Sequence, residues 1–180
     1  MKTTSRFLFT VALLSITLVF VVGCKSVTPV NNGIIAPFTP DEIEAAYEAG
    51  RDGDWERVCD MLQAQPGLAK VCFRKHERYT LLHFAAKDGN VEAVRSLIAK
   101  GADVNAQIMC GETPLHEAVN DDNIKLVEML IKCGAKVNAI DDNGDTPLDL
   151  PISDEVRELL KKHGAKTSDE LKEKTTDKGK

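Results

Sequence analysis

The sequence is poor in aromatic residues and lacks the short motifs that mark most enzymes. Aromatics make up 5% of its 180 residues, and it has no G-x-S-x-G motif, phosphate-binding glycine loop or Cys-x-x-Cys pair. Lysine and arginine total 23 against 28 aspartates and glutamates, so the positive excess that nucleic acids require is absent too. We therefore expect a protein that is not an enzyme, with no catalytic residue, no cofactor and no nucleic-acid partner.

Long hydrophobic runs are also scarce, and the one near the start is short. Lys2 and Arg6 precede 16 apolar or small uncharged residues ending at Val22, fewer than the roughly 20 that span a bilayer. This layout predicts a signal peptide over residues 1–23. The segment Val21-Val22-Gly23-Cys24 resembles the bacterial lipobox, which implies a lipoprotein whose Cys24 carries fatty acyl groups such as palmitate. An uncleaved membrane anchor and secretion without lipid are the alternatives.

Residues 24–38 contain Pro, Gly and Asn without periodicity, and we interpret them as the lipidated cysteine and a flexible tether. The expected location is the cell envelope. Because Lys25 rather than Asp follows the cysteine, the resemblance implies the outer membrane, facing the periplasm, in a Gram-negative host. Without Lys2 and Arg6 the chain has 21 basic and 28 acidic side chains, and its charge of −7 predicts no adhesion to anionic lipid by charge alone.

The body of the chain repeats every 33 residues. TLLHFAAKDGN from Thr80 aligns with TPLHEAVNDDN from Thr113, and a third Thr-Pro-Leu starts at Thr146. This period and the T-P-L-H motif resemble the ankyrin-repeat family. The resemblance implies an all-α solenoid of about four helix-turn-helix units with short hairpin loops.

The resemblance extends over residues 39–166, divided into 39–73, 74–107, 108–140 and 141–166. The first unit is divergent, and Thr39 and Glu42 form a predicted capping box. The last unit is about three residues short. Residues 167–180 have alternating charges and one large apolar residue, so we predict a disordered tail, with a frayed helical turn as the alternative.

His116 and Glu117 resemble the start of the zinc-protease motif H-E-x-x-H, but position 120 is Asn. In the ankyrin family a histidine at this place is structural, and no metal site is expected. Cys59, Cys72, Cys110 and Cys133 permit three disulfide pairings, or free thiols, and the sequence does not choose.

The resemblance implies that the chain binds a protein through its hairpin tips and its concave helical face. A monomer is expected. The family's variable positions fall on His76, Glu77, Tyr79, Lys87, Asp88, Met109, Cys110, Glu112, Asn120, Asp121, Asp142, Asn143 and Asp145.

Aspartates crowd the last two units, at positions 121, 122, 141, 142 and 145, so a partner with a basic patch is expected. An immunity or inhibitor-type protein that masks an enzyme or toxin is the alternative function. Arg78 stands where the family has a turn glycine, which leaves the shape of the first hairpin open, and Asp122 stands in a glycine position between two helices.

Overall fold

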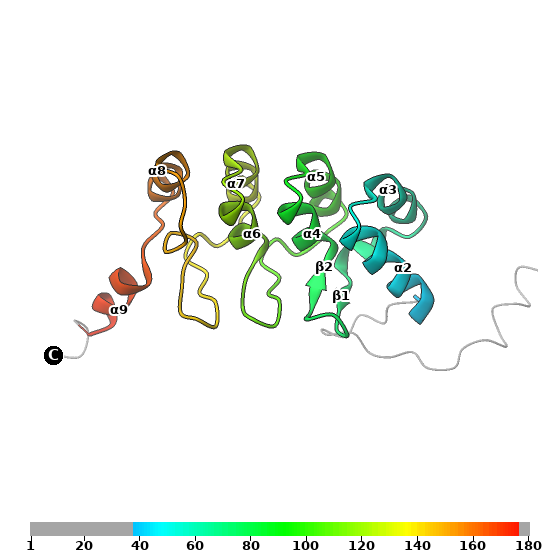
Figure 1. The fold of residues 1–180 in the computed structure, drawn as a ribbon, viewed down its shortest axis with the longest axis horizontal. Helices are drawn as coiled ribbons and strands as arrows, with labels where there is room; N and C mark the ends of the chain where they lie inside the picture. Colours follow the sequence, from blue (N-terminus) through cyan, green and yellow to red (C-terminus); the bar gives the residue numbers. More distant parts are fainter. Residues whose placement is uncertain (1–37, 177–180) are drawn as a thin grey trace, which may run out of the picture. The chain divides into compact units, whose positions relative to one another are not determined.

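The computed structural model describes residues 38–176, which form a row of helix pairs joined by short turns (Figure 1). The signal peptide, Cys24, most of the tether and residues 177–180 lie outside the described residues. The inner helices are α2 (Pro40–Arg51), α4 (Leu81–Lys87) and α6 (Pro114–Asn120). The outer helices are α3 (Trp55–Ala64), α5 (Val91–Ala99), α7 (Ile124–Lys132) and α8 (Asp154–Lys162). The expected all-α solenoid is confirmed.

Four further elements complete the described chain. A 3-10 helix, η1 (Pro66–Lys70), follows α3, and α9 (Ser168–Thr176) follows α8. Two short strands, β1 (Cys72–Phe73) and β2 (Tyr79–Thr80), pair antiparallel in the first hairpin, with Phe73 opposite Tyr79. Among the described helices, none combines the length and the apolar character needed to cross a bilayer.

Side-chain caps fix where the helices begin. Thr39 and Glu42 form the predicted capping box, since the Thr39 N–H donates to the glutamate and the Glu42 N–H donates to the Thr39 hydroxyl. Asn90 and Asn123 accept from the third helical N–H of α5 and α7 at 3.0 and 3.2 Å. Each repeat therefore carries its own start signal for the outer helix.

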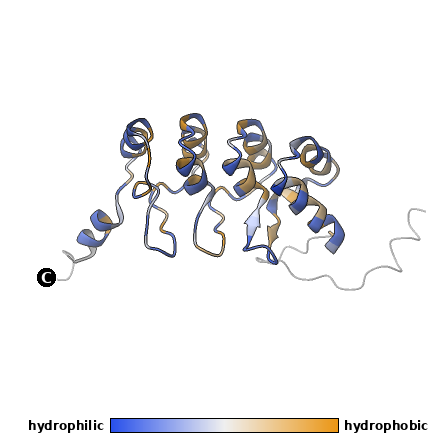
Figure 2. Ribbon diagram, viewed as in Figure 1, coloured by the Kyte–Doolittle hydropathy of each residue, from blue (hydrophilic) through white to orange (hydrophobic). Residues whose placement is uncertain are grey.

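The core lies between neighbouring helix pairs, and Figure 2 shows the hydrophobic colour concentrated where helices face each other. Two residues at equivalent positions of α5 and α7 are fully buried in each helix: Val94, Leu97, Val127 and Leu130. Ile124, the first residue of α7, is in contrast 43% exposed. Burying a leucine fully contributes about 1.5–3 kcal/mol, so most of the stability arises between units.

His83 and His116 lie in the first turns of α4 and α6, where each ring contacts the threonine before its helix. The Thr113 N–H donates to Nδ1 of His116 at 3.1 Å, and the Thr113 hydroxyl lies 2.9 Å from the same atom. The hydroxyl of Thr80 is equally close to Nδ1 of His83. Because Nδ1 of His116 accepts, its neutral ring carries the proton on Nε2.

The Nε2 atoms point to the ends of the next hairpin. That of His83 faces the carbonyls of Ala106 and Glu112, although no acceptor meets full hydrogen-bond geometry with it. Burial lowers the pKa of His83 to about 4, and it also lowers the pKa of His116. Both rings are therefore neutral structural groups.

The fourth unit differs from the prediction because it has no first helix. Residues 147–149 form only a turn, although Leu148 is still buried. Pro151 lacks the N–H that would continue a helix begun at Pro147, and it disfavours helical backbone at the residue before it. The missing helix agrees with the shortening seen in the sequence.

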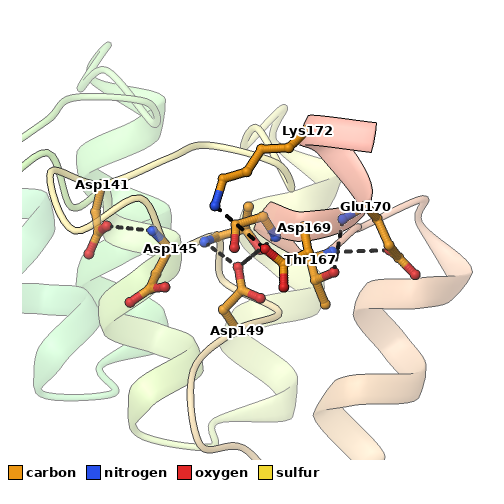
Figure 3. A network of polar contacts seen from close by, with 9 residues as sticks. Asp141, Asp145, Asp149, Thr167, Asp169, Glu170 and Lys172 are labelled. Carbon is orange, nitrogen blue, oxygen red and sulfur yellow. Dashed lines mark hydrogen bonds and ion pairs between the residues drawn. The ribbon is translucent and has the colours of Figure 1, made fainter. Parts of the chain in front are cut away.

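The tail was predicted to be disordered from residue 167, and this is wrong for residues 168–176, which form α9. The Thr167 N–H donates to the Glu170 carboxylate and the Glu170 N–H donates to the Thr167 hydroxyl, so a capping box starts the helix. Asp149, which replaces the repeat histidine, accepts from the Ser168 N–H at 2.9 Å (Figure 3). The alternating charges do not predict this anchoring contact, because its acceptor, Asp149, lies 19 residues earlier in the chain.

Asp149 holds the last unit together. The same carboxylate oxygen accepts from the N–H and the hydroxyl of Thr146 at 2.8 and 2.9 Å. Burial opposes its charge, but the hydrogen bonds from Thr146 and Ser168 outweigh burial, and the pKa of Asp149 is lowered.

We expect Asp149→Ala to destabilise the protein and to release α9. The buried Thr146 N–H would lose its acceptor, which costs about 1–3 kcal/mol, and the first turn of α9 would lose its anchor. Hydrogen exchange of the α9 amides should accelerate. Asp142→Ala, which removes an exposed carboxylate, is the control, and equal exchange of α9 in both variants would contradict this role for Asp149.

Because the pKa of His83 is depressed, the unfolded chain binds more protons below pH 6.5 than the folded chain does. The contribution of His83 to stability is therefore complete above pH 6.5 and declines as the pH falls toward 4, by about 3 kcal/mol in all. Chemical denaturation of wild type and His83→Asn across this range measures it. The stability difference between the two should shift in favour of the variant as the pH falls, and parallel curves would refute the assignment.

Candidate functional site

The thirteen residues predicted to bind a partner lie in two places. Nine are on the hairpins: His76, Glu77, Tyr79, Met109, Cys110, Glu112, Asp142, Asn143 and Asp145. Four are at the C-terminal ends of α4 and α6: Lys87, Asp88, Asn120 and Asp121. In Figure 1 the loops of the three hairpins project to one side of the helix row, and α4 and α6 lie between these loops and the outer helices.

Backbone hydrogen bonds join the three hairpins into one surface. The Met109 N–H donates to the Glu77 carbonyl at 2.8 Å, and the Asp142 N–H donates to the Cys110 carbonyl at 2.9 Å. We call residues 74–79, 108–112 and 141–145 the hairpin ridge. Because each tip is bonded to the next, the ridge is ordered before any partner arrives.

The first hairpin closes despite the lack of glycine. Glu77 and Arg78 have φ of 52° and 62°, a left-handed conformation that costs a side chain roughly 1–2 kcal/mol. The half-buried His76 side chain holds the turn against α2. Its ring stacks on Tyr47 at 3.6 Å between centroids, and its Nε2 lies 3.1 Å from the Glu44 carboxylate. His76 therefore serves the first unit more than the binding surface.

Tyr79 is only partly exposed. Its ring stacks on Phe84 at 5.0 Å and meets His83 edge-on at 5.8 Å, both in its own unit. The hydroxyl donates to the Glu117 carboxylate at 3.4 Å. Burial and the nearby Glu117 charge raise the pKa of Tyr79 to about 12, so the phenol stays protonated.

Glu117, which is not among the thirteen predicted residues, also belongs to this surface because its carboxylate accepts from Tyr79. Burial and the neighbouring Glu112 raise the pKa of its carboxyl, and Lys87 opposes them. Tyr79, Glu112 and Glu117 thus combine an aromatic ring with two carboxylates between the first two hairpins and α6. Only the pairing of Glu117 with Tyr79, 38 residues away, reveals its role.

Met109 is the most exposed large apolar residue described, at 65%, and it stands on the hairpin ridge as predicted. Ile140 is also exposed, at 49%, and directly precedes the last hairpin. It was missed because the family's variable positions do not include it. Large exposed apolar side chains favour contact with a protein partner.

The predicted acidic cluster divides into structural and exposed members. Asp141 is buried, and its carboxylate accepts from the Asn143 and Asp145 N–H groups at 2.9 and 2.8 Å, which closes the last hairpin (Figure 3). Asp122 has φ 52° and accepts from the Ser153 N–H. Asp121 and Asp142 are exposed and remain available to a partner.

Asp88 also has a structural contact, because it accepts a hydrogen bond from the Trp55 indole at 3.0 Å. This bond joins the turn after α4 to the first residue of α3. Asp88 therefore contributes to the cohesion of the first two units as well as to the predicted surface.

The groups that could suggest catalysis are accounted for by packing. His116 is buried against Thr113, and Asn120 supplies no second imidazole. Within residues 38–176 no group of three or more metal-ligating side chains gathers. The four cysteines of this range are free thiols, and burial raises the pKa of Cys110, which disfavours a reactive thiolate.

A hollow of about 550 Å³ opens between the end of α8 and α9. Its lining includes Leu148, Lys161 and Glu170 but no nucleophile paired with a base.

The chain resembles known proteins in its repeat region. The profile described as "Ankyrin repeats (3 copies)" matches residues 48–141 and 82–170. A rice protein (Oryza sativa subsp. japonica) named "Probable E3 ubiquitin-protein ligase XBOS33" is 38% identical over 77 residues, which are 39% of this chain and 13% of that protein. An Arabidopsis thaliana protein named "E3 ubiquitin-protein ligase XBAT33" is 40% identical over 70 residues, again 39% of this chain and 14% of that protein.

The chain thus spans only 13–14% of the length of these curated relatives. The profile match, in contrast, covers most of residues 39–166, where the repeats were predicted. On this ground the chain belongs to the ankyrin-repeat family.

Proposed function

We propose that this chain is a non-catalytic protein-binding module, held at a bacterial envelope membrane by a lipid on Cys24. The ubiquitin-ligase activity in the relatives' names is not part of the proposal, since the shared segment is a small part of those proteins. The observation that supports binding most directly is the hairpin ridge. Its tips are joined by backbone hydrogen bonds, and it displays Met109 at 65% exposure.

Partner recognition in this proposal combines an apolar anchor with negative charge. Met109 supplies contact area, and Tyr79 adds a half-buried aromatic edge fixed by its bond to Glu117. Exposed carboxylates at Asp121 and Asp142 favour a partner with a basic patch. Because the ridge is already ordered, it loses little conformational entropy on binding. More of the contact free energy of these groups therefore appears as affinity.

Membrane attachment rests on the sequence. Two basic residues, a 16-residue apolar run and Gly23-Cys24 follow each other in the order of a lipoprotein signal. Acyl chains contribute about 0.8 kcal/mol per buried methylene, and two or more chains hold a protein stably at a bilayer. The tether of 24–38 would keep the repeats within on the order of 20 Å of the lipid.

For the binding surface, we expect Met109→Ala to weaken binding about tenfold, or roughly 1.4 kcal/mol, by removing an anchor on the hairpin ridge. The partner is first captured by crosslinking in native membranes, and its affinity for the purified repeats is then measured by titration calorimetry. Ile124→Ala is the matched control, because Ile124 is also exposed and apolar but lies on an outer helix.

Equal losses in the two variants would show that the hairpin ridge is not the binding surface. Affinity for the same partner should also decrease as NaCl rises, because charge complementarity between exposed groups is screened. An affinity that does not change with salt would argue against a partner with a basic patch.

For the anchor, we expect cells grown with an alkyne-bearing palmitate to label wild type but not Cys24→Ala. Mass spectrometry of the purified wild-type chain should show Cys24 as an acylated first residue, with residues 1–23 removed. Cys133→Ala serves as the control for loss of a thiol elsewhere. Recovery of an unlabelled chain that keeps residues 1–23 would support the uncleaved anchor instead.

A further inference from the structure

Lysines gather at one edge of the solenoid. The segments that end or follow the four outer helices are residues 63–70, 99–105, 132–138 and 161–167, and together they contain seven lysines, one aspartate and no other fully charged residue. We call these lysines the lysine edge: Lys70, Lys100, Lys132, Lys136, Lys161, Lys162 and Lys166. These segments are positive although the whole chain has a formal charge of −5, and three nearby carboxylates offset part of that charge. Glu128 pairs with Lys132 at 2.8 Å, and Glu170 and Glu173 of α9 line the same hollow as Lys161 and Lys166.

A ladder of asparagine hydrogen bonds aligns these segments. The Asn105 amide donates to the Gly134 carbonyl at 3.1 Å, and its oxygen accepts from the Lys136 N–H at 2.8 Å. Asn138 makes the same two bonds one unit later, to the Gly164 carbonyl and from the Lys166 N–H. Lys136 and Lys166 therefore occupy equivalent positions in successive units.

Contacts across units confirm that the edge is continuous. A Cβ placed on Gly101 would lie 2.7 Å from Cε of Lys70, so the Lys70 side chain lies across the end of α5. The hydrogen bond from Lys132 lowers the pKa of Glu128, and Lys162 and His163 of the next unit add to the effect. The single aspartate of the edge, Asp103, uses its carboxylate to accept from the Asn105 N–H.

The opposite edge has the opposite sign. The turns that precede the outer helices, residues 51–54, 87–90, 120–123 and 151–154, hold six aspartates against one lysine and one arginine. Negative groups at helix starts and positive groups at helix ends both complement the helix dipole. Their repetition in every unit gives the whole array a charge separation from one edge to the other.

The net charge of the chain does not control how this edge meets a surface. A nine-residue helix such as α7 is about 13 Å long, whereas the screening length at physiological salt is about 8 Å. The aspartates at the far ends of the outer helices are therefore largely screened from anything that touches the lysine edge. The predicted absence of adhesion to anionic lipid was based on the net charge alone. That value does not take account of the separation of positive and negative groups between the two edges.

We propose that the lysine edge docks against an anionic phospholipid surface and thereby orients the repeats on the membrane. This inference rests on the membrane attachment proposed above, which would keep the edge near lipid headgroups. Lysines on flexible stems, without the planar fork of arginine, match a diffuse layer of phosphates better than a single shaped ligand. The hairpin ridge would then be free to meet a protein partner.

Vesicle flotation of the fragment Phe38–Lys180 tests the docking. This fragment is one compact unit whose core cluster lies entirely within it, and it lacks Cys24 and the apolar run. We expect it to bind vesicles containing phosphatidylglycerol, to release them as NaCl rises, and to ignore vesicles of phosphatidylcholine alone. Replacing Lys136, Lys161 and Lys162 by Gln should weaken binding about fivefold per lysine, or roughly a hundredfold in all.

The matched control replaces Arg57, Arg95 and Lys125 by Gln. These three are exposed on outer helices away from their C-terminal ends, and their loss changes the net charge by the same amount. Equal losses of vesicle binding in the two triple variants, or no preference of wild type for phosphatidylglycerol, would overturn the proposal. Circular dichroism melts check that both variants fold.

Orientation gives an independent readout. A fluorophore on Cys133, which is exposed within the lysine edge, should be quenched by spin-labelled headgroups. The same fluorophore at position 120, after Asn120→Cys and with the native cysteines replaced by Ser, should not be quenched. Equal quenching would refute a fixed orientation. Failure here would leave acylation of Cys24 and partner binding untouched, because neither is present in these measurements.

Discussion

The structure depends on the burial of each helix pair against the next pair. Leu97 of α5 and Leu130 of α7 are fully buried, and so are Leu82 and Leu115 of the inner helices. No helix of seven to twelve residues would be stable alone in water, so the units exist only as a stack. The position of every loop in the described chain follows from this one-dimensional packing.

The same packing determines the polar chemistry. His83 and His116 are buried at the joints between units, where desolvation keeps them neutral and their Nδ1 atoms meet Thr80 and Thr113. At the last joint Asp149 stands in place of the histidine. Its carboxylate also accepts a hydrogen bond from the Ser168 N–H at the start of α9. The replacement of the repeat histidine by Asp149 therefore attaches α9 to the last unit.

Stacking also arranges the surfaces. Repeating a loop at a constant spacing aligns the hairpin tips, and their backbones then bond to each other between Glu77 and Met109 and between Cys110 and Asp142. Repeating a helix end aligns lysines in the same way. The same stacking thus produces the hairpin ridge, which we propose binds a protein, and the lysine edge, which we propose docks on anionic lipid.

The sequence by itself determined the repeat and the cap at Thr39, because these depend on spacing and on contacts within a few residues. The fold class and the structural role of His116 followed from the resemblance of that repeat to the ankyrin family. Tertiary structure decided which surface residues are free. Asp141 and His76 looked available but make internal bonds, whereas Glu117 gains its environment from Tyr79, 38 residues away. The turn that replaces a helix after Pro147 and the anchored α9 were likewise settled between units, since packing partners distant in sequence leave no local pattern.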